Sequence, residues 1–248
     1  MTPTRNFDLL ERFTTKFPGN KALSEKIDGE WLFYTSEQYS EIAHQFAYGL
    51  LKLGFKKGDK IMTVTNNRPQ WNFVDMGMSM AGVIHVPVYT SMNAEEYSYV
   101  MKHSDSKMVI VSDKKLYEMI APEAKKIKEV EHFFTFDTIE GANHWSEVLE
   151  TGKNASEETK EKLETIKKEI QAEEVVSIIY TSGTTGRSKG VMLTHKNLVS
   201  NFLAASGVFQ MNDTDRYLAI IPVCHVGGRL GNYQTQYAGS CIYYAENM

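Results

Sequence analysis

The chain alternates between two hydrophobic periodicities, and this alternation predicts its secondary structure. Seven short apolar runs are rich in β-branched and aromatic residues and are bounded by Gly, Asn, Asp or Pro, which is typical of strands. Several of them are apolar on both faces, as strands buried in a parallel sheet are. These predicted strands cover residues 60–65, 83–88, 107–112, 132–136, 175–181, 217–221 and 240–244.

Patterns with a period of 3.6 residues fill the intervals between those strands and predict helices. Thr35 with Gln38, and Asn93 with Glu96, each match a helix-capping pair, and Gly54 is a typical stop. Strands that alternate with helices at this spacing form right-handed βαβ units. The fold class is therefore α/β, with mostly parallel sheets and flanking helices. The predicted helices cover residues 36–53, 69–77, 93–104 and 195–208.

The stretch from Asn154 to Glu174 differs in composition from the rest of the chain. Leu163, Ile166 and Ile170 form one narrow apolar stripe among Lys and Glu residues. A helix of this kind either binds a partner or a membrane surface, or packs on the flank of a sheet, and the mixed charge sign favours packing. The stretch also marks a boundary. We expect an N-terminal α/β subdomain over residues 1–172 and the start of a second subdomain over residues 173–248.

Composition and charge exclude several classes of protein. Hydrophobic residues make up 42% and charged residues 23%, as in globular proteins. The net charge of −4 disfavours a nucleic-acid-binding protein. Two cysteines cannot form a disulfide framework, the first residues lack the apolar core of a secretion signal, and no run is long enough to span a membrane. We therefore expect a cytoplasmic protein with at most peripheral membrane contact.

One segment is unusually rich in residues that can bind a ligand: residues 180–195, which read YTSGTTGRSKGVMLTH. It follows a predicted buried strand and precedes a predicted helix. Its glycines let the backbone turn tightly, and its hydroxyls, free amides and lysine are the donors that a polyphosphate needs. The same residue types could also form a polar surface turn. The candidate phosphate ligands are Thr181, Ser182, Gly183, Thr184, Thr185, Gly186 and Lys189.

This segment does not match the phosphate loop of the P-loop nucleotide-binding proteins. That loop requires the pattern G-x-x-x-x-G-K-[ST]. Here Gly183 is followed five residues later by Ser188, and Lys189 is followed by Gly190. The mismatch makes a phosphotransferase the weakest of the functional hypotheses.

The segment instead resembles the Y-T-S-G-T-T-G-x-x-K-G-V signature of the adenylate-forming (AMP-forming) acyl and aryl synthetases. Asn66–Trp71 is similar to the N-R-P-x-W element of the long-chain acyl-CoA synthetases in that superfamily. Ile221–His225 and Tyr243–Glu246 are similar to the P-x-x-H-V and Y-Y-A-E elements of the same group. The resemblance extends from Ala22 to Met248.

The resemblance implies the fold of the N-terminal domain of these enzymes and a reaction in two halves. A fatty-acid carboxylate attacks the α-phosphorus of ATP to give acyl-adenylate and pyrophosphate, and coenzyme A then forms the thioester and releases AMP. Charge stabilisation dominates such a reaction. By resemblance, Lys189 and His225 are the catalytic candidates, the glycine- and hydroxyl-rich residues bind the phosphates, and Thr181 contacts Mg²⁺.

Three departures from the family pattern leave alternatives open. Ser188 stands where the family usually has proline, and Val226-Gly-Gly-Arg229 stands where the acyl-CoA branch often continues with Phe-Glu-Arg. The family members are also much longer, with a downstream acidic motif, a ribose-binding aspartate and a C-terminal domain with a catalytic lysine. We therefore expect part of a fatty acid–CoA ligase. The alternative is a non-catalytic nucleotide- or acyl-binding fragment, inactive alone, whose exposed sheet edge favours a homodimer.

Several single residues have two interpretations each. Thr181 could equally bond the backbone at a strand end, and His225 could be structural or lie near the carboxylate and α-phosphate. His195 is expected to serve the start of a helix, with Thr194 as its N-cap. The two cysteines are expected to be small buried hydrophobes. The aromatic residues Trp71, Phe73, Tyr89 and Tyr97 are expected in the core, with lining of an acyl tunnel as the alternative.

Overall fold

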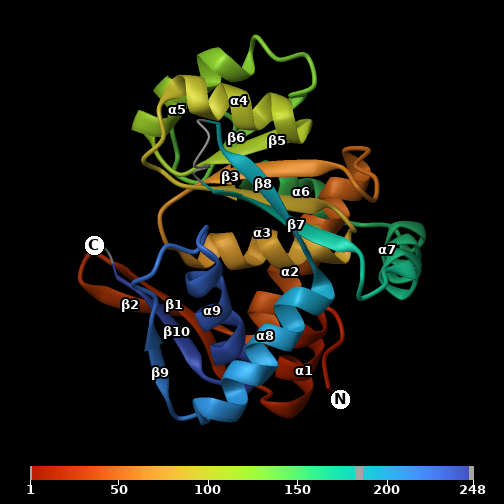
Figure 1. Cartoon of the computed structure of the whole chain (residues 1–248). Coiled ribbons are helices and arrows are strands. Elements are labelled where there is room, and N and C mark those ends of the chain that lie inside the picture. The colour runs from red at the N-terminus through yellow and green to blue at the C-terminus, as the bar shows by residue number, and fades with distance from the viewer. Residues whose placement is uncertain (1, 182–186, 246–248) are drawn as a thin grey trace.

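Two mostly parallel sheets organise the chain in the computed structural model, which describes residues 2–181 and 187–245. The larger sheet has the strand order β6-β5-β3-β4-β7-β8, and only its β7–β8 pair is antiparallel. The smaller sheet has the order β2-β1-β10-β9, and only its β1–β2 pair is antiparallel (Figure 1). The strands are β1 (Lys21–Ile27), β2 (Glu30–Thr35), β3 (Lys60–Val64), β4 (Ile84–Val88), β5 (Ser106–Val111), β6 (His132–Thr135), β7 (Val175–Thr181), β8 (Lys189–Thr194), β9 (Arg216–Leu218) and β10 (Cys241–Tyr244).

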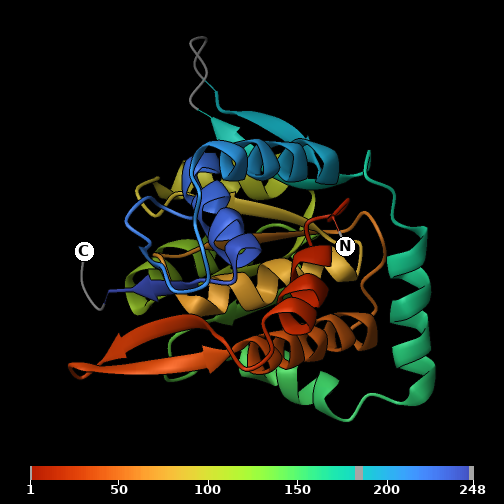
Figure 2. The same cartoon turned by 90° about the horizontal axis from the view of Figure 1, so that it is seen from below.

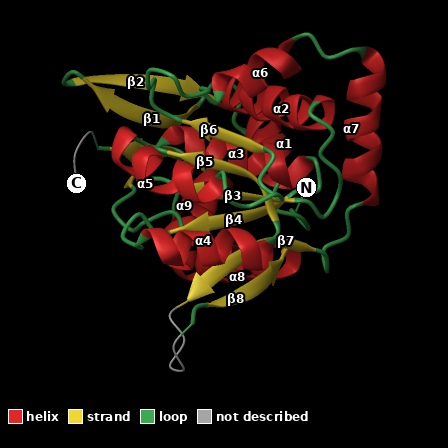
Figure 3. Ribbon diagram, turned by 90° about the horizontal axis from the view of Figure 1, so that it is seen from above, coloured by secondary structure: helices red, strands yellow, loops and turns green. Residues whose placement is uncertain are grey.

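Helices cover the larger sheet on both faces, and this arrangement confirms the predicted α/β class. α4 and α5 lie on the outer face, whereas α2 and α3 lie between the two sheets (Figures 1 and 2). Seen from above, α8 and β8 lie at one edge of the larger sheet (Figure 3). The helices are α1 (Asp8–Lys16), α2 (Ser36–Lys52), α3 (Pro69–Met80), α4 (Ala94–Ser104), α5 (Lys114–Ala124), α6 (Ser146–Lys153), α7 (Glu157–Glu169), α8 (His195–Val208) and α9 (Val226–Ala238).

Alternation of side chains along the strands divides the core into two layers. Ile61 of β3 faces the helices between the sheets, whereas its neighbour Met62 faces α4 and α5. Both side chains are buried because both faces of this parallel sheet are covered by helices. β3, β4 and β7 pair in parallel, so their carboxyl ends meet at one edge of the sheet. Ligands bind at this edge in open α/β folds.

Local capping explains where several helices begin, as the sequence predicts. Thr35 accepts the N–H of Gln38, and Asn93 accepts the N–H of Glu96, so both predicted capping boxes are present. Thr194 is the N-cap of α8, also as predicted. α3 begins at Pro69 and continues past the predicted end at Gly77.

Several elements of the structure are absent from the sequence-based prediction, among them the strands β1, β2 and β8. The hairpin of β1 and β2 turns at Asp28 and Gly29, which both have positive φ angles. An Asp-Gly pair between two apolar runs is a recognised hairpin signal and could have revealed it. β8 follows the glycine-rich segment directly, whereas the prediction placed a helix next.

The charged segment packs by its apolar stripe, as predicted, but the stripe lies against helices and not against the flank of a sheet. α7 packs against α2, with α3 beside it, and it buries Leu163 there. The boundary at 172/173 falls between α7 and β7 and stays a prediction, although each sheet combines strands from both sides of it. Within the described part of the chain, none of the helices has the length and apolar character needed to cross a bilayer.

Candidate nucleotide-binding site

The β7–β8 hairpin places two of the candidate ligands opposite each other. Thr181 is the last residue of β7 and pairs with Lys189, the first residue of β8. Both side chains are exposed. The other candidate phosphate ligands, Ser182, Gly183, Thr184, Thr185 and Gly186, lie outside the described residues. The structure therefore fixes the positions of Thr181 and Lys189, which lie at the two ends of the candidate phosphate-binding segment.

Close packing beneath the hairpin explains the glycine that follows Lys189. Gly190 pairs with Tyr180, and a Cβ atom at position 190 would lie 2.9 Å from Ile178 Cγ2 and 3.4 Å from Tyr180 Cζ. Tyr180 is buried, as predicted, and its hydroxyl is 2.7 Å from His103 Nδ1. Burial raises the pKa of Tyr180 to about 12, so it remains a neutral phenol.

Thr181 fits a limited role in magnesium binding. The described residues contain no group of three or more His, Cys, Asp or Glu side chains that could hold a metal ion. An ion held mainly by phosphate oxygens needs only one or two hard oxygen ligands from the protein. The exposed hydroxyl of Thr181, opposite Lys189, can supply one of them.

His225 is the N-cap of α9, and its side chain is exposed. Its Nδ1 accepts the backbone N–H of Gly227 at 3.0 Å. In the neutral ring the proton therefore lies on Nε2, which can donate to an oxygen atom of a ligand. The expectation that a strand continues almost to His225 is wrong, because β9 ends at Leu218.

Asn67 explains why the chain leaves the sheet before His225. Its Nδ2 donates to the carbonyls of Ala219 (2.7 Å) and Ile221 (2.9 Å), and its Oδ1 accepts the N–H of Val223 (2.8 Å). These backbone groups therefore bond to a side chain and not to another strand. Asn67 belongs to the 66–71 element, but its sequence context alone predicts no role for it.

Gly228, the second glycine of the pair that departs from the family pattern, has a steric reason. The backbone carbonyls of Ile221 and Pro222 lie against the first turn of α9. A Cβ atom at Gly228 would lie 2.4 Å from Pro222 O and 2.6 Å from Ile221 O. Any side chain at position 228 would force these segments apart, so the local path of the backbone requires glycine there.

A buried polar cluster lies one helical turn below His225. The carboxylate of Asp75 on α3 accepts from Arg229 (2.5 Å), from the hydroxyl of Tyr233 (2.6 Å) and from His85 Nδ1 (2.7 Å). His85 Nε2 is in turn 2.7 Å from the hydroxyl of Thr63. Burial opposes ionisation of Asp75, yet Arg229 and the hydrogen bonds keep its pKa below the usual value. The cluster ties α9 to α3 and to the larger sheet.

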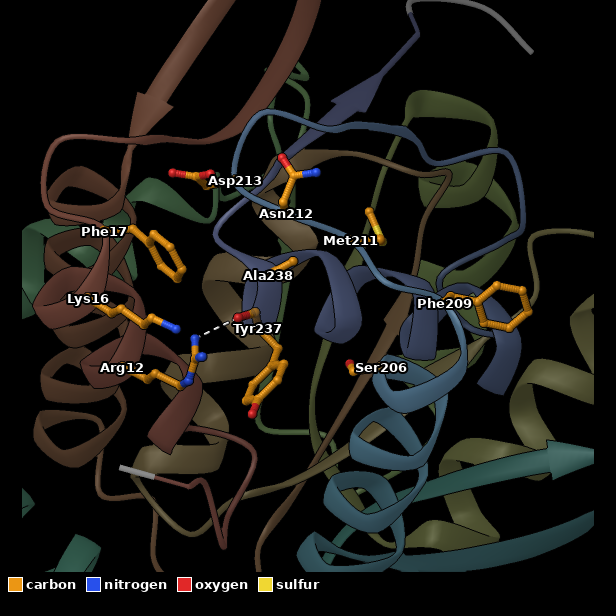
Figure 4. A pocket seen from close by; sticks show the side chains of 10 residues that line it. All are labelled: Arg12, Lys16, Phe17, Ser206, Phe209, Met211, Asn212, Asp213, Tyr237 and Ala238. Atoms are coloured by element: carbon orange, nitrogen blue, oxygen red, sulfur yellow. Dashed lines mark hydrogen bonds between the residues drawn. The ribbon is translucent and has the colours of Figure 1, made fainter.

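The opposite end of α9 is held by a second contact. Arg12 donates to the carbonyl of Tyr237 at 2.6 Å, and its guanidinium carbon lies 3.9 Å from the centre of the Tyr237 ring (Figure 4). These residues line a hollow of about 370 Å³. The arginine satisfies a carbonyl in the last turn of α9 and stacks on the tyrosine, which gives it a structural role.

The remaining candidates are buried or half-buried. Cys224 and Cys241 are buried, as expected, and burial raises the pKa of their thiols to about 12 and about 11. His195 begins α8 as predicted, but it is buried against Asn6, with Nδ1 2.8 Å from Asn6 Oδ1. Tyr89 is half-buried at the end of β4. The aromatic residues fully in the core, as predicted, are Trp71, Phe73 and Tyr97.

Sequence reasoning missed Tyr99 and His103 of α4, whose side chains contact residues on both sides of the candidate segment. Neither residue belongs to a motif. The available signal was their spacing, since residues four apart on a predicted helix share one face.

Known proteins are similar to this chain in both sequence and fold. Fatty acyl-CoA synthetase B of Dictyostelium discoideum is 30% identical over 209 residues, which cover 79% of this chain and 30% of that protein. A putative long-chain fatty-acid CoA ligase from Rhodopseudomonas palustris has the same fold, with a TM-score of 0.82, 21% identity and coverage of 97% of this chain and 57% of that one. The anthranilate CoA ligase AuaEII, in complex with anthranoyl-AMP, has a TM-score of 0.81 at 23% identity, covering 96% of this chain and 44% of that one.

The similarity covers almost the whole chain but only part of these relatives. The chain spans between 30% and 43% of the length of the curated relatives it matches. The family model for AMP-binding enzymes matches residues 10–248, which include the β7–β8 hairpin and the His225 segment. The chain therefore belongs to the AMP-binding enzyme family.

Proposed function

We propose that this chain forms the N-terminal part of an ATP-dependent long-chain fatty acid–CoA ligase. The observation that carries the proposal is the pairing of exposed Thr181 with exposed Lys189, at the two ends of a segment rich in hydroxyls and glycine. Membership of the AMP-binding family and similarity to fatty acyl-CoA synthetases support ATP, a fatty acid and coenzyme A as substrates.

In the first half-reaction, the fatty-acid carboxylate attacks the α-phosphorus of ATP and pyrophosphate leaves. Negative charge then grows on the phosphoryl oxygens and on the leaving group. The Lys189 ammonium opposes this charge from one end of the phosphate-binding segment, and each such charged hydrogen bond contributes about 1.5–3 kcal/mol. The Nε2–H of His225 donates to an oxygen of the carboxylate or α-phosphate.

Thr181 would hold Mg²⁺ through its hydroxyl, and the ion would supply positive charge to the phosphates. By their sequence alone, the remaining candidate phosphate ligands are Ser182, Gly183, Thr184, Thr185 and Gly186. No protein nucleophile is needed for this chemistry. The two buried thiols, with their raised pKa values, are unsuited to act as one.

Product analysis tests the reaction. We expect the longest natural protein that contains this chain to exchange pyrophosphate into ATP when a fatty acid is present, and to release AMP with acyl-CoA. Absence of exchange with every acyl chain length contradicts the ligase, and release of ADP indicates phosphoryl transfer instead.

For the 248-residue chain alone, we propose nucleotide binding without turnover, because it spans less than half the length of the relatives. Calorimetric titration with Mg·ATP, followed by an assay for thioester formation, tests this. Robust acyl-CoA formation by the chain alone contradicts it.

We also propose that the chain self-associates and that it functions in the cytoplasm, where a reducing environment suits its two buried thiols. The edge strand β8 exposes Met192, and Ile220 lies exposed just beyond the edge strand β9. Sedimentation over a range of concentrations tests the association, and a monomer at every concentration contradicts it.

A further inference from the structure

Helix α4 presents two aromatic side chains to the β7–β8 hairpin. Tyr99 and His103 lie four residues apart on one face of α4, and their ring centres are 5.2 Å apart. Both rings also contact the ring of Tyr180 edge-on, with centre distances of 6.5 Å from Tyr99 and 5.7 Å from His103. We call Tyr99 and His103 together the α4 clamp.

His103 holds the residue that precedes Thr181. Its Nδ1 is 2.7 Å from the hydroxyl of Tyr180. Because Tyr180 is a neutral phenol, its hydroxyl can donate to this nitrogen. The side chain of Tyr180 is buried in the cluster under α4, so the bond connects the end of β7 to the core.

Tyr99 holds the two residues that precede Lys189. Its hydroxyl donates to the carbonyl of Ser188 at 3.1 Å. The guanidinium carbon of Arg187 lies 5.5 Å from the centre of the Tyr99 ring, within the range of a cation–π interaction. One side chain therefore contacts both residues through which the chain enters β8.

A hollow separates the rest of α4 from these two residues. It measures about 420 Å³, and Tyr99, Lys102, Arg187 and Ser188 are among the residues that line it. Because of this open space, few side chains other than Tyr99 can pack against residues 187–188. The Tyr99 hydroxyl bond is therefore a specific link across this gap, and its removal leaves little to replace it.

We propose that the α4 clamp consists of positioning residues that keep Thr181 and Lys189 in register for binding a triphosphate. His103 acts on Thr181 through Tyr180, and Tyr99 acts on Lys189 through Ser188. The inference rests on the proposed nucleotide-binding function. It adds that two positioning residues on α4 determine how well the hairpin binds its ligand.

The test uses the 248-residue chain and the variant Tyr99→Phe, which removes the hydroxyl but keeps the ring for Arg187 and His103. Two readouts are needed: the rate of trypsin cleavage after Arg187, followed by mass spectrometry, and the Kd for Mg·ATP from calorimetry. We expect both to rise about threefold to tenfold, the effect of one lost hydrogen bond, while Tm stays within about 2 °C of the unchanged chain.

Tyr117→Phe is the matched control, because Tyr117 packs against the same core and its hydroxyl makes no hydrogen bond to other described residues. This variant should change neither readout. At the other end of the segment, His103→Phe should weaken Mg·ATP binding. His103→Gln should retain most of the affinity, because the glutamine side-chain oxygen can accept the hydrogen bond of the Tyr180 hydroxyl.

The two readouts separate this inference from the proposed function. An unchanged cleavage rate in Tyr99→Phe overturns the clamp, and faster cleavage with an unchanged Kd overturns its role in nucleotide binding. If the unsubstituted chain shows no heat of Mg·ATP binding and no protection of Arg187 by Mg·ATP, the proposed function of this chain fails. Faster cleavage of Tyr99→Phe still supports the structural clamp in that case.

Discussion

The buried polar residues around Asp75 and the exposed polar residues of the β7–β8 hairpin differ in the partners available to them. Around Asp75 every member is buried, and the carboxylate receives bonds from Arg229, Tyr233 and His85. At the hairpin, Thr181 and Lys189 are exposed, and Lys189 forms no ion pair with other described residues.

The difference shows how this fold separates stability from binding. A buried charge must have its partners inside the protein, because losing one partner leaves the other charge without solvent. An exposed cation at the end of a strand costs little to leave unpaired, and it remains available to an anionic ligand. Substitutions in the first group should therefore change the free energy of unfolding, and those in the second should change affinity.

The largest effect is expected from Asp75→Asn. This change leaves the Arg229 guanidinium without its counter-charge in the interior and should lower the free energy of unfolding by about 3–5 kcal/mol. Urea denaturation measures it. The control is Lys57→Met, which breaks the exposed Lys57–Glu174 pair (2.8 Å) and should cost less than about 1 kcal/mol. Equal losses in both variants contradict the distinction.

Acidification should produce the next largest effect. Burial, with help from Arg5, lowers the pKa of His195 to about 4, whereas the unfolded value is about 6.5. As the pH falls, His195 is therefore protonated in the unfolded chain before it is protonated in the folded chain. The free energy of unfolding falls as the pH drops from 6.5 to 4, by up to about 3 kcal/mol from this residue. Denaturation midpoints at several pH values measure the slope. His195→Gln should flatten it, and an unchanged slope in that variant rules out His195 as the cause.

At the hairpin, Lys189→Met should weaken Mg·ATP binding by about 10- to 100-fold, because a charged hydrogen bond contributes about 1.5–3 kcal/mol. The free energy of unfolding should change by less than about 0.5 kcal/mol, since the side chain is exposed. Calorimetry and urea denaturation measure the two quantities. Lys196→Met, an exposed lysine on α8, is the control and should alter neither. A loss of stability without a loss of affinity places Lys189 in the structural group.

The smallest effect is expected from Thr181→Val, which removes one hydroxyl at nearly constant shape. We expect the Kd for Mg·ATP to rise about threefold to tenfold. The Kd for ATP measured with a chelator present should not change, because the proposed contact is to the metal ion. Equal losses with and without magnesium point to a direct phosphate contact by Thr181 instead.

Local chemistry explains what could be predicted from the sequence. The caps at Thr35, Asn93 and Thr194 depend on bonds to residues three positions away, so their patterns are visible in the chain itself. Several strands of the larger sheet are apolar on both faces, and this pattern predicts their positions and the α/β class, whereas the largely exposed strand β8 is not predicted. The glycine- and hydroxyl-rich segment predicts phosphate binding from its own residues, and this stays a prediction.

Only the tertiary structure decided which distant residues meet. Asp75 and Arg229 are 154 positions apart, and Tyr99 and Ser188 are 89 apart, so no local pattern links either pair. Asn67 ends β9 early by bonding the backbone around Ile221, which a strand-like run of side chains cannot reveal. Sequence determines local conformation through hydrogen bonds that span a few residues. The pairing of strands and the burial of charge depend on the whole fold.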